Sequence, residues 1–117
     1  MQPVWAREVT KHRPVVGGKW NDVVKSSGER HGKAKYGPHP QITEAMIEKM
    51  EMDTIVEGTE LPRPKEHVRA FWRKLDEIIG TSKGQLTSFI YVEYHMNGAV
   101  HGYPVTRDEL VAKGADL

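Results

Sequence analysis

The sequence predicts a single α+β domain with a central amphipathic helix and a C-terminal β-hairpin that is followed by a short helix. Apolar residues recur at helical spacing over residues 64–79, which indicates the central helix. A run of β-branched and aromatic residues over 89–95 precedes Asn97-Gly98, which is a strong hairpin signal. A capping-box pattern that begins at Thr106 predicts the last helix.

Composition and charge divide the chain, residues 1–117, into two parts. Residues 1–40 are rich in Gly, Pro and Ser and carry eight basic and three acidic residues, a net charge of +5. Residues 41–117 carry nine basic and thirteen acidic residues, a net charge of −4, and contain the patterns of a compact helix and hairpin part. This asymmetry points to a polyanionic partner for the basic front segment, although a basic segment can also pack beside an acidic one within one fold.

The front segment, residues 1–40, is expected to be rich in loops. Residues 4–10 favour a short strand, and apolar residues at i, i+3 and i+4 from Trp20 predict a short amphipathic helix that Gly28 ends. Residues 26–40 offer almost nothing to bury, so we expect a mobile loop there.

Two helices are predicted in the compact part. Thr43 is a suitable N-cap for a helix that reaches about Met52, and the pattern leaves open whether residues 54–56 continue it or form a short strand. Pro64 suits the first position of the central helix, and Gly80 suits the residue after its end. The buried stripe of this central helix is predicted to consist of Val68, Phe71, Trp72, Leu75, Ile78 and Ile79.

The hairpin is predicted to turn through a two-residue loop at Asn97-Gly98. This register pairs Tyr94 with His101 and places His95 and His101 on opposite faces. Because Pro104 cannot donate a ladder hydrogen bond, we expect the returning strand at the edge of the sheet. The face expected to pack on the core contains Ile90, Val92, Tyr94, Met96, Ala99, His101, Tyr103 and Val105. The other face contains Phe89, Tyr91, Glu93, His95 and Val100.

No catalytic or metal-binding pattern is found in the sequence. Cysteine is absent, the six histidines lack the usual metal-ligand spacings, and His95 and His101 on opposite faces could not share an ion. Neither a P-loop nor a nucleophile elbow occurs. Glu93 and His95 could form a base with its orienting carboxylate, but a surface ion pair is the commoner outcome at this spacing. We therefore expect a protein that is not an enzyme and has neither a metal site nor a cofactor.

Basic and aromatic residues alternate in the front segment, which indicates contacts with nucleic acid. Lysine and arginine would meet phosphates, and Tyr36 would stack on a base. The predicted nucleic-acid-binding residues are Lys11, Arg13, Lys19, Lys25, Arg30, Lys33, Lys35 and Tyr36. Residues 75–86 also fit the turn and start of a DNA-recognition helix that would present Ser82, Lys83 and Gln85, but the strand-forming residues that follow favour a hairpin.

These observations predict a non-catalytic, small regulatory or inhibitory binding protein. Its basic front segment would engage nucleic acid or a protein that processes nucleic acid. The first alternative is a protein–protein adaptor or inhibitor that binds through the hairpin edge and an exposed aromatic face formed by Phe89, Tyr91 and Val100. The second is a helix-turn-helix DNA binder. The chain contains no long apolar run and no secretory pattern, so no membrane partner and a cytoplasmic location are expected.

Overall fold

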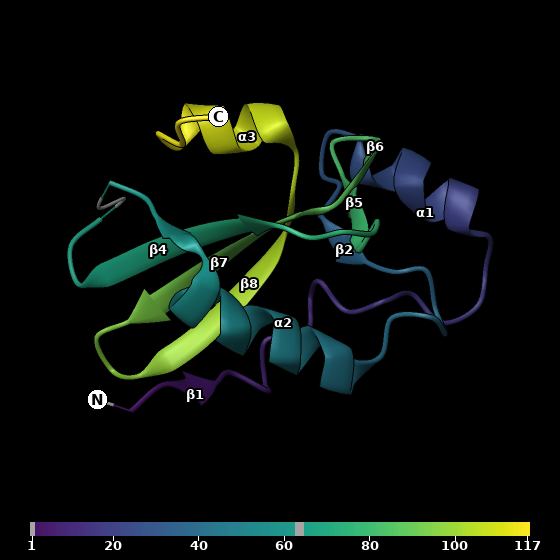
Figure 1. The fold of residues 1–117 in the computed structure, drawn as a ribbon. Coiled ribbons are helices and arrows are strands. Elements are labelled where there is room, and N and C mark those ends of the chain that lie inside the picture. Colours follow the sequence, from purple (N-terminus) through teal and green to yellow (C-terminus); the bar gives the residue numbers. More distant parts are fainter. Residues whose placement is uncertain (1, 63–64) are drawn as a thin grey trace.

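A computed structural model describes residues 2–62 and 65–117 and shows an α+β fold with two sheets and three helices (Figure 1). The larger sheet has the strand order β1 (Val4–Trp5), β8 (Ala99–Val105), β7 (Phe89–His95), β4 (Val68–Lys74) and β3 (Thr59–Glu60). The smaller sheet has the order β2 (Lys35–Tyr36), β5 (Gly80–Ser82) and β6 (Gln85–Thr87). The helices are α1 (Trp20–Ser27), α2 (Glu44–Glu57) and α3 (Arg107–Ala112). Within the described ranges, no helix has the length and apolar character needed to cross a membrane.

The larger sheet is covered on both faces, by α2 on one side and by α3 on the other (Figure 1). The core on the α2 side contains Trp5, Tyr36, Ile42, Ile47, Ile79, Ile90, Val92 and Val100. The core on the α3 side contains Leu61, Ala70, Tyr91, Val105 and Leu110. Helix α1 lies against the smaller sheet, where the Oγ of Ser27 lies 3.0 Å from the Thr81 Oγ1.

The predicted end of α1 and the predicted starts of α2 and α3 are confirmed. Gly28 ends α1, and the Thr43 side chain accepts a hydrogen bond from the Met46 N–H at the start of α2. Thr106 and Glu109 form the predicted capping box of α3. Helix α2 also settles the open question over residues 54–56, since it continues through them.

The predicted central helix over 64–79 is wrong. Residues 68–74 form strand β4, which pairs with β7 along its whole length, and the proposed first position, Pro64, lies outside the described residues. Both faces of β4 are covered, so Ala70 and Phe71 are both buried and the strand lacks alternation. Apolar side chains that face both sides of the sheet, such as Phe71 and Trp72, stand at consecutive positions, and in a short window this pattern resembles the spacing of a helix. Ile78, which was predicted to belong to the buried stripe, is 46% exposed.

The hairpin turns where it was predicted, but its register differs by one residue. The loop has three residues, because Tyr94 pairs with Val100 and Glu93 pairs with His101. Gly98 adopts a φ of 93°, and its N–H donates to the His95 carbonyl oxygen at 2.9 Å, as in a three-residue loop that closes with a glycine. A shift of one residue exchanges the two faces of β8.

The prediction that the returning strand lies at the edge of the sheet is wrong for the first part of β8. Val4 and Trp5 of β1 pair with Ala99 and Val100, and Pro104 lies beyond this paired part. Of the short strand predicted over 4–10, only Val4–Trp5 form a strand, β1.

Two further expectations fail in the smaller sheet. Residues 26–40 contain β2, which pairs with β5, and Tyr36 is completely buried, so this stretch is not a featureless loop. Residues 80–87 form a hairpin rather than a recognition helix, with positive φ at Lys83 (53°) and Gly84 (78°) in its turn. The helix-turn-helix alternative is excluded by these strands.

Candidate functional site

Four lysines from three segments surround adjoining hollows beside the smaller sheet. We call Lys11, Lys33, Lys35 and Lys83 the lysine cluster. Lys11, Lys33 and Lys83 line a hollow of about 270 Å³ together with His12 and Tyr103. Lys33 and Lys35 line a second hollow of about 300 Å³, and the Lys35 ammonium group donates to the Lys11 carbonyl oxygen at 2.6 Å. Pairing of β2 with β5 thus brings front-segment cations to the β5–β6 turn.

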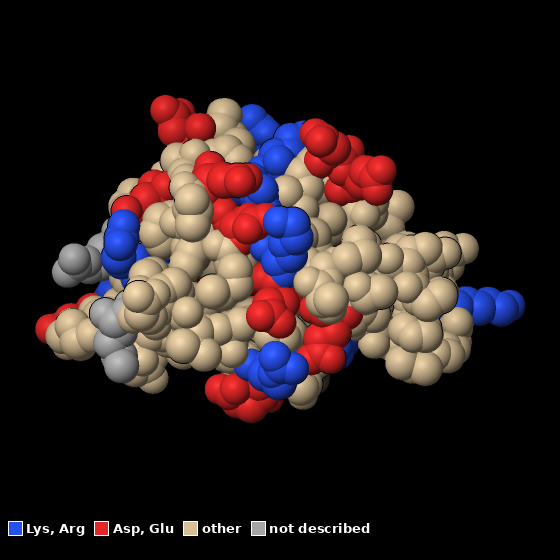
Figure 2. Space-filling model, turned by 60° about the horizontal axis from the view of Figure 1, so that its bottom comes forward, with Lys and Arg blue, Asp and Glu red and all other residues tan. Residues whose placement is uncertain are grey.

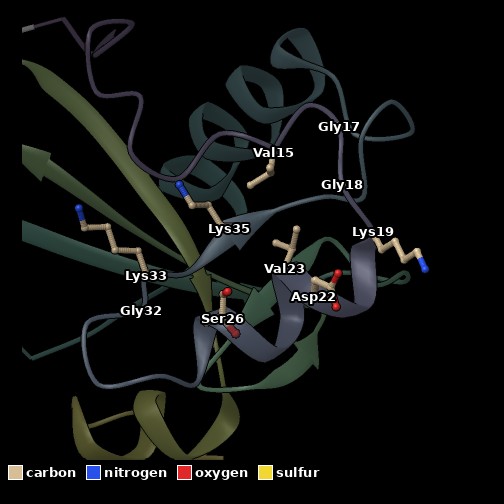
Figure 3. Close-up of a pocket in the computed structure, with 11 residues that line it drawn as sticks. Val15, Gly17, Gly18, Lys19, Asp22, Val23, Ser26, Gly32, Lys33 and Lys35 are labelled. Atoms are coloured by element: carbon tan, nitrogen blue, oxygen red, sulfur yellow. The ribbon is translucent and has the colours of Figure 1, made fainter.

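Figure 3 shows the residues that line the second hollow. The side chains of Val15 and Val23 point toward each other and form its apolar part, whereas Lys33 and Lys35 direct their ammonium groups to the same side. The Lys19 ammonium group points away from them. Only two of the three lysines that line this hollow therefore contribute to a common positive surface.

The positive charges of the lysine cluster are close enough to oppose one another. Burial, and then the charge of Lys33, lowers the pKa of Lys35. Burial also lowers the pKa of His12, against a hydrogen bond to the Ala34 carbonyl oxygen, and the charges of Lys11 and Lys35 lower it further. The His12 Nδ1 lies 2.7 Å from that carbonyl oxygen and therefore carries the proton, because a carbonyl can only accept. An anion at this surface would relieve the repulsion.

Each hollow has one acidic residue in its lining, Glu109 in the first and Asp22 in the second. Glu109 accepts hydrogen bonds from the Ser82 hydroxyl at 2.6 Å and from the Thr106 N–H at 3.0 Å. By contrast, the face in Figure 2 shows acidic and basic side chains beside each other, so neither sign dominates there. The ion pairs of α2, such as Lys49–Asp53 at 2.8 Å, belong to this mixed kind of surface.

The structure gathers only part of the predicted nucleic-acid-binding set. Arg13 lies 4.4 Å over the Trp5 ring and 3.8 Å from Glu44, with its side chain 18% exposed. Lys25 and Arg30 are exposed but line neither hollow. Lys83 lies outside the basic front segment, so the excess of positive charge in residues 1–40 does not point to it.

Tyr36 does not have the expected stacking role. Its ring is completely buried, and its hydroxyl donates to Glu51 Oε2 at 2.7 Å. The prediction assumed that residues flanked by Gly and Pro stay exposed, but pairing of β2 with β5 covers the ring. Contacts with a nucleic acid would therefore have to come from cations rather than from this aromatic side chain.

The alternative protein-binding face does not exist as predicted. Tyr91 and Val100 are buried, and Phe89 is half-buried with its ring centroid 6.2 Å from that of Trp72. The changed register also places Val100 in the core on the α2 side, opposite to Tyr91. The three residues therefore form no exposed aromatic surface.

The same register creates a second cluster, which the predicted two-residue loop had ruled out. His95 and His101, expected on opposite faces, lie with their Nε2 atoms 3.1 Å apart, and His95 Nε2 is also 3.1 Å from Glu93 Oε1. His101 Nε2 is 3.7 Å from the same carboxylate oxygen. The Tyr91 hydroxyl donates to the other oxygen, Oε2, at 2.7 Å. We call Glu93, His95 and His101 the Glu93 cluster.

The Glu93 cluster is partly shielded from solvent. Burial would raise the pKa of Glu93, but the Tyr91 hydrogen bond and the charges of Lys65 and the two histidines outweigh it, and the pKa is lowered. Burial lowers the pKa of His101, although Glu93 opposes this. A carboxylate beside two imidazoles can hold a proton or a metal cation.

Aromatic rings connect the two clusters. His12 packs on Tyr103 at 4.8 Å between ring centroids, and Tyr103 lies 5.2 Å from Tyr91. Burial, and then the negative charges of Glu93 and Glu109, raises the pKa of Tyr103 to about 12, so its hydroxyl stays protonated at neutral pH. The hollow lined by Tyr103 is thus next to the face that carries Glu93.

Comparison of the chain with protein-family models, with curated proteins and with solved structures gives no match. Function is therefore inferred from the two clusters alone.

Proposed function

We propose that this protein is a non-catalytic binding protein that contacts the phosphodiester backbone of nucleic acid through the lysine cluster. One observation carries the proposal. Lys11 and Lys33 of the front segment and Lys83 of the β5–β6 turn line one hollow, although they are far apart in the sequence. Lysine is a point-charge donor that suits phosphate oxygens.

The charge distribution supports a local rather than a global attraction. The whole chain has a net charge of only +1, so long-range attraction to a polyanion is weak. The lysine cluster supplies four positive charges at one place. The acids that line the two hollows are Glu109, which accepts hydrogen bonds from Ser82 and Thr106, and Asp22. Because Tyr36 is buried, we expect phosphate contacts without base stacking by that ring and little sequence preference.

The proposal predicts that charge removal at Lys33 and Lys83 weakens binding. A Lys33→Ala/Lys83→Ala variant is expected to bind labelled random-sequence RNA and DNA about tenfold or more weakly at low salt. The slope of log K against log salt should become shallower by roughly 1 for each phosphate that is no longer neutralised. Fluorescence anisotropy between about 50 mM and about 200 mM salt measures both quantities.

A matched control tests whether position matters rather than total charge. Lys49→Ala/Lys74→Ala removes the same two charges from exposed side chains outside the lysine cluster. This control should keep the parent's affinity and salt slope. Equal weakening by the two double variants, or no binding by the parent at low salt, would contradict the proposed function.

A further inference from the structure

The hairpin register brings three possible metal-ligand atoms together on one face of the larger sheet. Glu93 lies opposite His101 in the β7–β8 pair, and His95 lies two residues after Glu93 on the same face. The atoms Glu93 Oε1, His95 Nε2 and His101 Nε2 are separated by 3.1, 3.1 and 3.7 Å. The three side chains are 13%, 28% and 24% exposed, so the cluster is shielded but still reachable from solvent.

Hydrogen bonds alone do not satisfy this arrangement. An imidazole nitrogen offers either one N–H or one lone pair in the plane of the ring. His95 Nε2 nevertheless has two close neighbours, Glu93 Oε1 and His101 Nε2, and a single proton cannot point directly at both. The buried His101 Nδ1 has no hydrogen-bond partner among the described residues. One proton on His95 Nε2 therefore leaves one of its two close contacts without a direct hydrogen bond.

One cation among the three atoms would accept an electron pair from each of them. Zinc lies at about 2.0–2.1 Å from nitrogen and oxygen ligands, which corresponds to roughly 3.3 Å between ligand atoms in a tetrahedral site. The three observed separations lie on both sides of that value. Two histidines and one glutamate, with a fourth position left open, form a known type of zinc coordination. Imidazole ligands favour zinc, copper and nickel over magnesium and calcium.

Neighbouring groups support a cation at this place. The Tyr91 hydroxyl holds Glu93 Oε2 at 2.7 Å and so directs Oε1 toward the histidines, as outer hydrogen bonds do around metal ligands. The Lys65 ammonium group lies 3.9 Å from Glu93 Oε1 and is the competing cation. Its side chain is 60% exposed, so it can turn away into solvent.

We propose that Glu93, His95 and His101 bind one divalent transition-metal ion, with Zn²⁺ as the best geometric fit. This proposal uses no residue of the lysine cluster and does not rest on the proposed function. The two proposals can therefore fail separately.

The experiment uses the untagged full chain, freed of metal, and the metal alone as the probe. Isothermal titration calorimetry with Zn²⁺ is expected to show one ion per chain, and Co²⁺ is expected to develop the visible absorption of a four-coordinate site. A His95→Gln/His101→Gln variant should lose both signals, with an affinity at least a hundredfold lower. Tyr91→Phe should weaken binding by about tenfold, because the carboxylate loses its orienting hydrogen bond.

The matched control is His31→Gln/His39→Gln, which removes two exposed histidines outside the Glu93 cluster and should bind as the parent does. Circular dichroism establishes that each variant is folded, and the single variant His101→Gln replaces the double variant if that one unfolds. No binding of Zn²⁺ or Co²⁺ by the folded parent would overturn the proposal. Binding that survives in a folded His101→Gln chain, or that is lost in the control, would overturn it as well.

Discussion

Replacing Glu51 with alanine is expected to lower the free energy of unfolding by about 3–5 kcal/mol. Glu51 belongs to α2 and is 1% exposed. Its Oε1 accepts from the Trp5 indole N–H at 2.9 Å, and its Oε2 accepts from the Tyr36 hydroxyl at 2.7 Å. One carboxyl group thus joins α2 to β1 and β2. Alanine would leave two buried donors without this acceptor and would open a cavity between the three elements.

Chemical denaturation of the parent and the variants measures this effect. Glu48→Ala is the matched control on the same helix, because Glu48 is half-exposed and lies 3.8 Å from Arg7; its cost should stay within about 1 kcal/mol. Tyr36→Phe removes only one of the two hydrogen bonds and should cost about 1–2 kcal/mol. A Glu51→Ala protein as stable as Glu48→Ala would show that the buried carboxyl group does not hold these elements together.

The same residue predicts a pH dependence with a definite sign. Burial raises the pKa of Glu51, and the hydrogen bonds from Tyr36 and Trp5 and the charge of Arg13 reverse this only in part. A raised pKa in the folded state means that the stabilisation by Glu51 is fully present below its unfolded pKa of about 4.3 and is lost as the pH rises through the folded value. Glu51→Gln cannot ionise.

The stability difference between the parent and Glu51→Gln should therefore be largest at acid pH and should shrink toward neutral pH. Urea unfolding between about pH 4 and about pH 8 tests the trend. A difference that grows with pH would mean that the folded protein favours the ionised carboxylate.

Local signals in the sequence were sufficient for the end of α1, the starts of α2 and α3 and the position of the hairpin, whereas Gly80, expected to follow a helix, belongs to β5. A side-chain cap such as Thr43 or Thr106 acts within three residues, so its effect does not depend on the rest of the fold. The identity of β4 was not accessible in this way. Its residues contact α2 on one face and pack in the core that contains Leu110 of α3 on the other, and this cover depends on segments far away in the sequence.

The lysine cluster and the Glu93 cluster also differ in how far the sequence alone predicts them. The basic front segment was visible as an excess of charge, although β2 was needed to select Lys11, Lys33 and Lys35 and to add Lys83. The Glu93 cluster was not predicted, because the predicted strand register differs from the observed one by one residue. A two-residue loop places His95 and His101 on opposite faces, whereas the observed three-residue loop places them on the same face. A sequence with Met96 before Asn97-Gly98 is compatible with either loop.

Gly102 of β8 lies where the sheet leaves no space for a side chain. A Cβ at this position would lie 2.2 Å from the Tyr91 carbonyl oxygen and 3.1 Å from the Val92 Cα, both of them backbone atoms of the neighbouring strand. These atoms cannot turn away as the end of a flexible side chain could. The backbone of Gly102 also hydrogen-bonds to the Glu51 carboxyl group, so a displaced β8 would disturb that link too.

Gly102→Ala is therefore expected to destabilise the fold by more than about 3 kcal/mol, since relief of the clash requires separation of β7 and β8. Gly17→Ala provides the control: a Cβ there meets nothing within 4 Å, and only its φ of 81° is unfavourable for alanine, which corresponds to about 1–2 kcal/mol. Thermal or urea unfolding of both variants separates steric overlap from backbone conformation. Because Gly102 follows His101 directly, any Gly102→Ala protein that still folds should also bind Co²⁺ more weakly than the Gly17→Ala protein does. A Gly102→Ala protein at least as stable as Gly17→Ala would contradict the close approach of the two strands, and with it the hairpin geometry on which the Glu93 cluster depends.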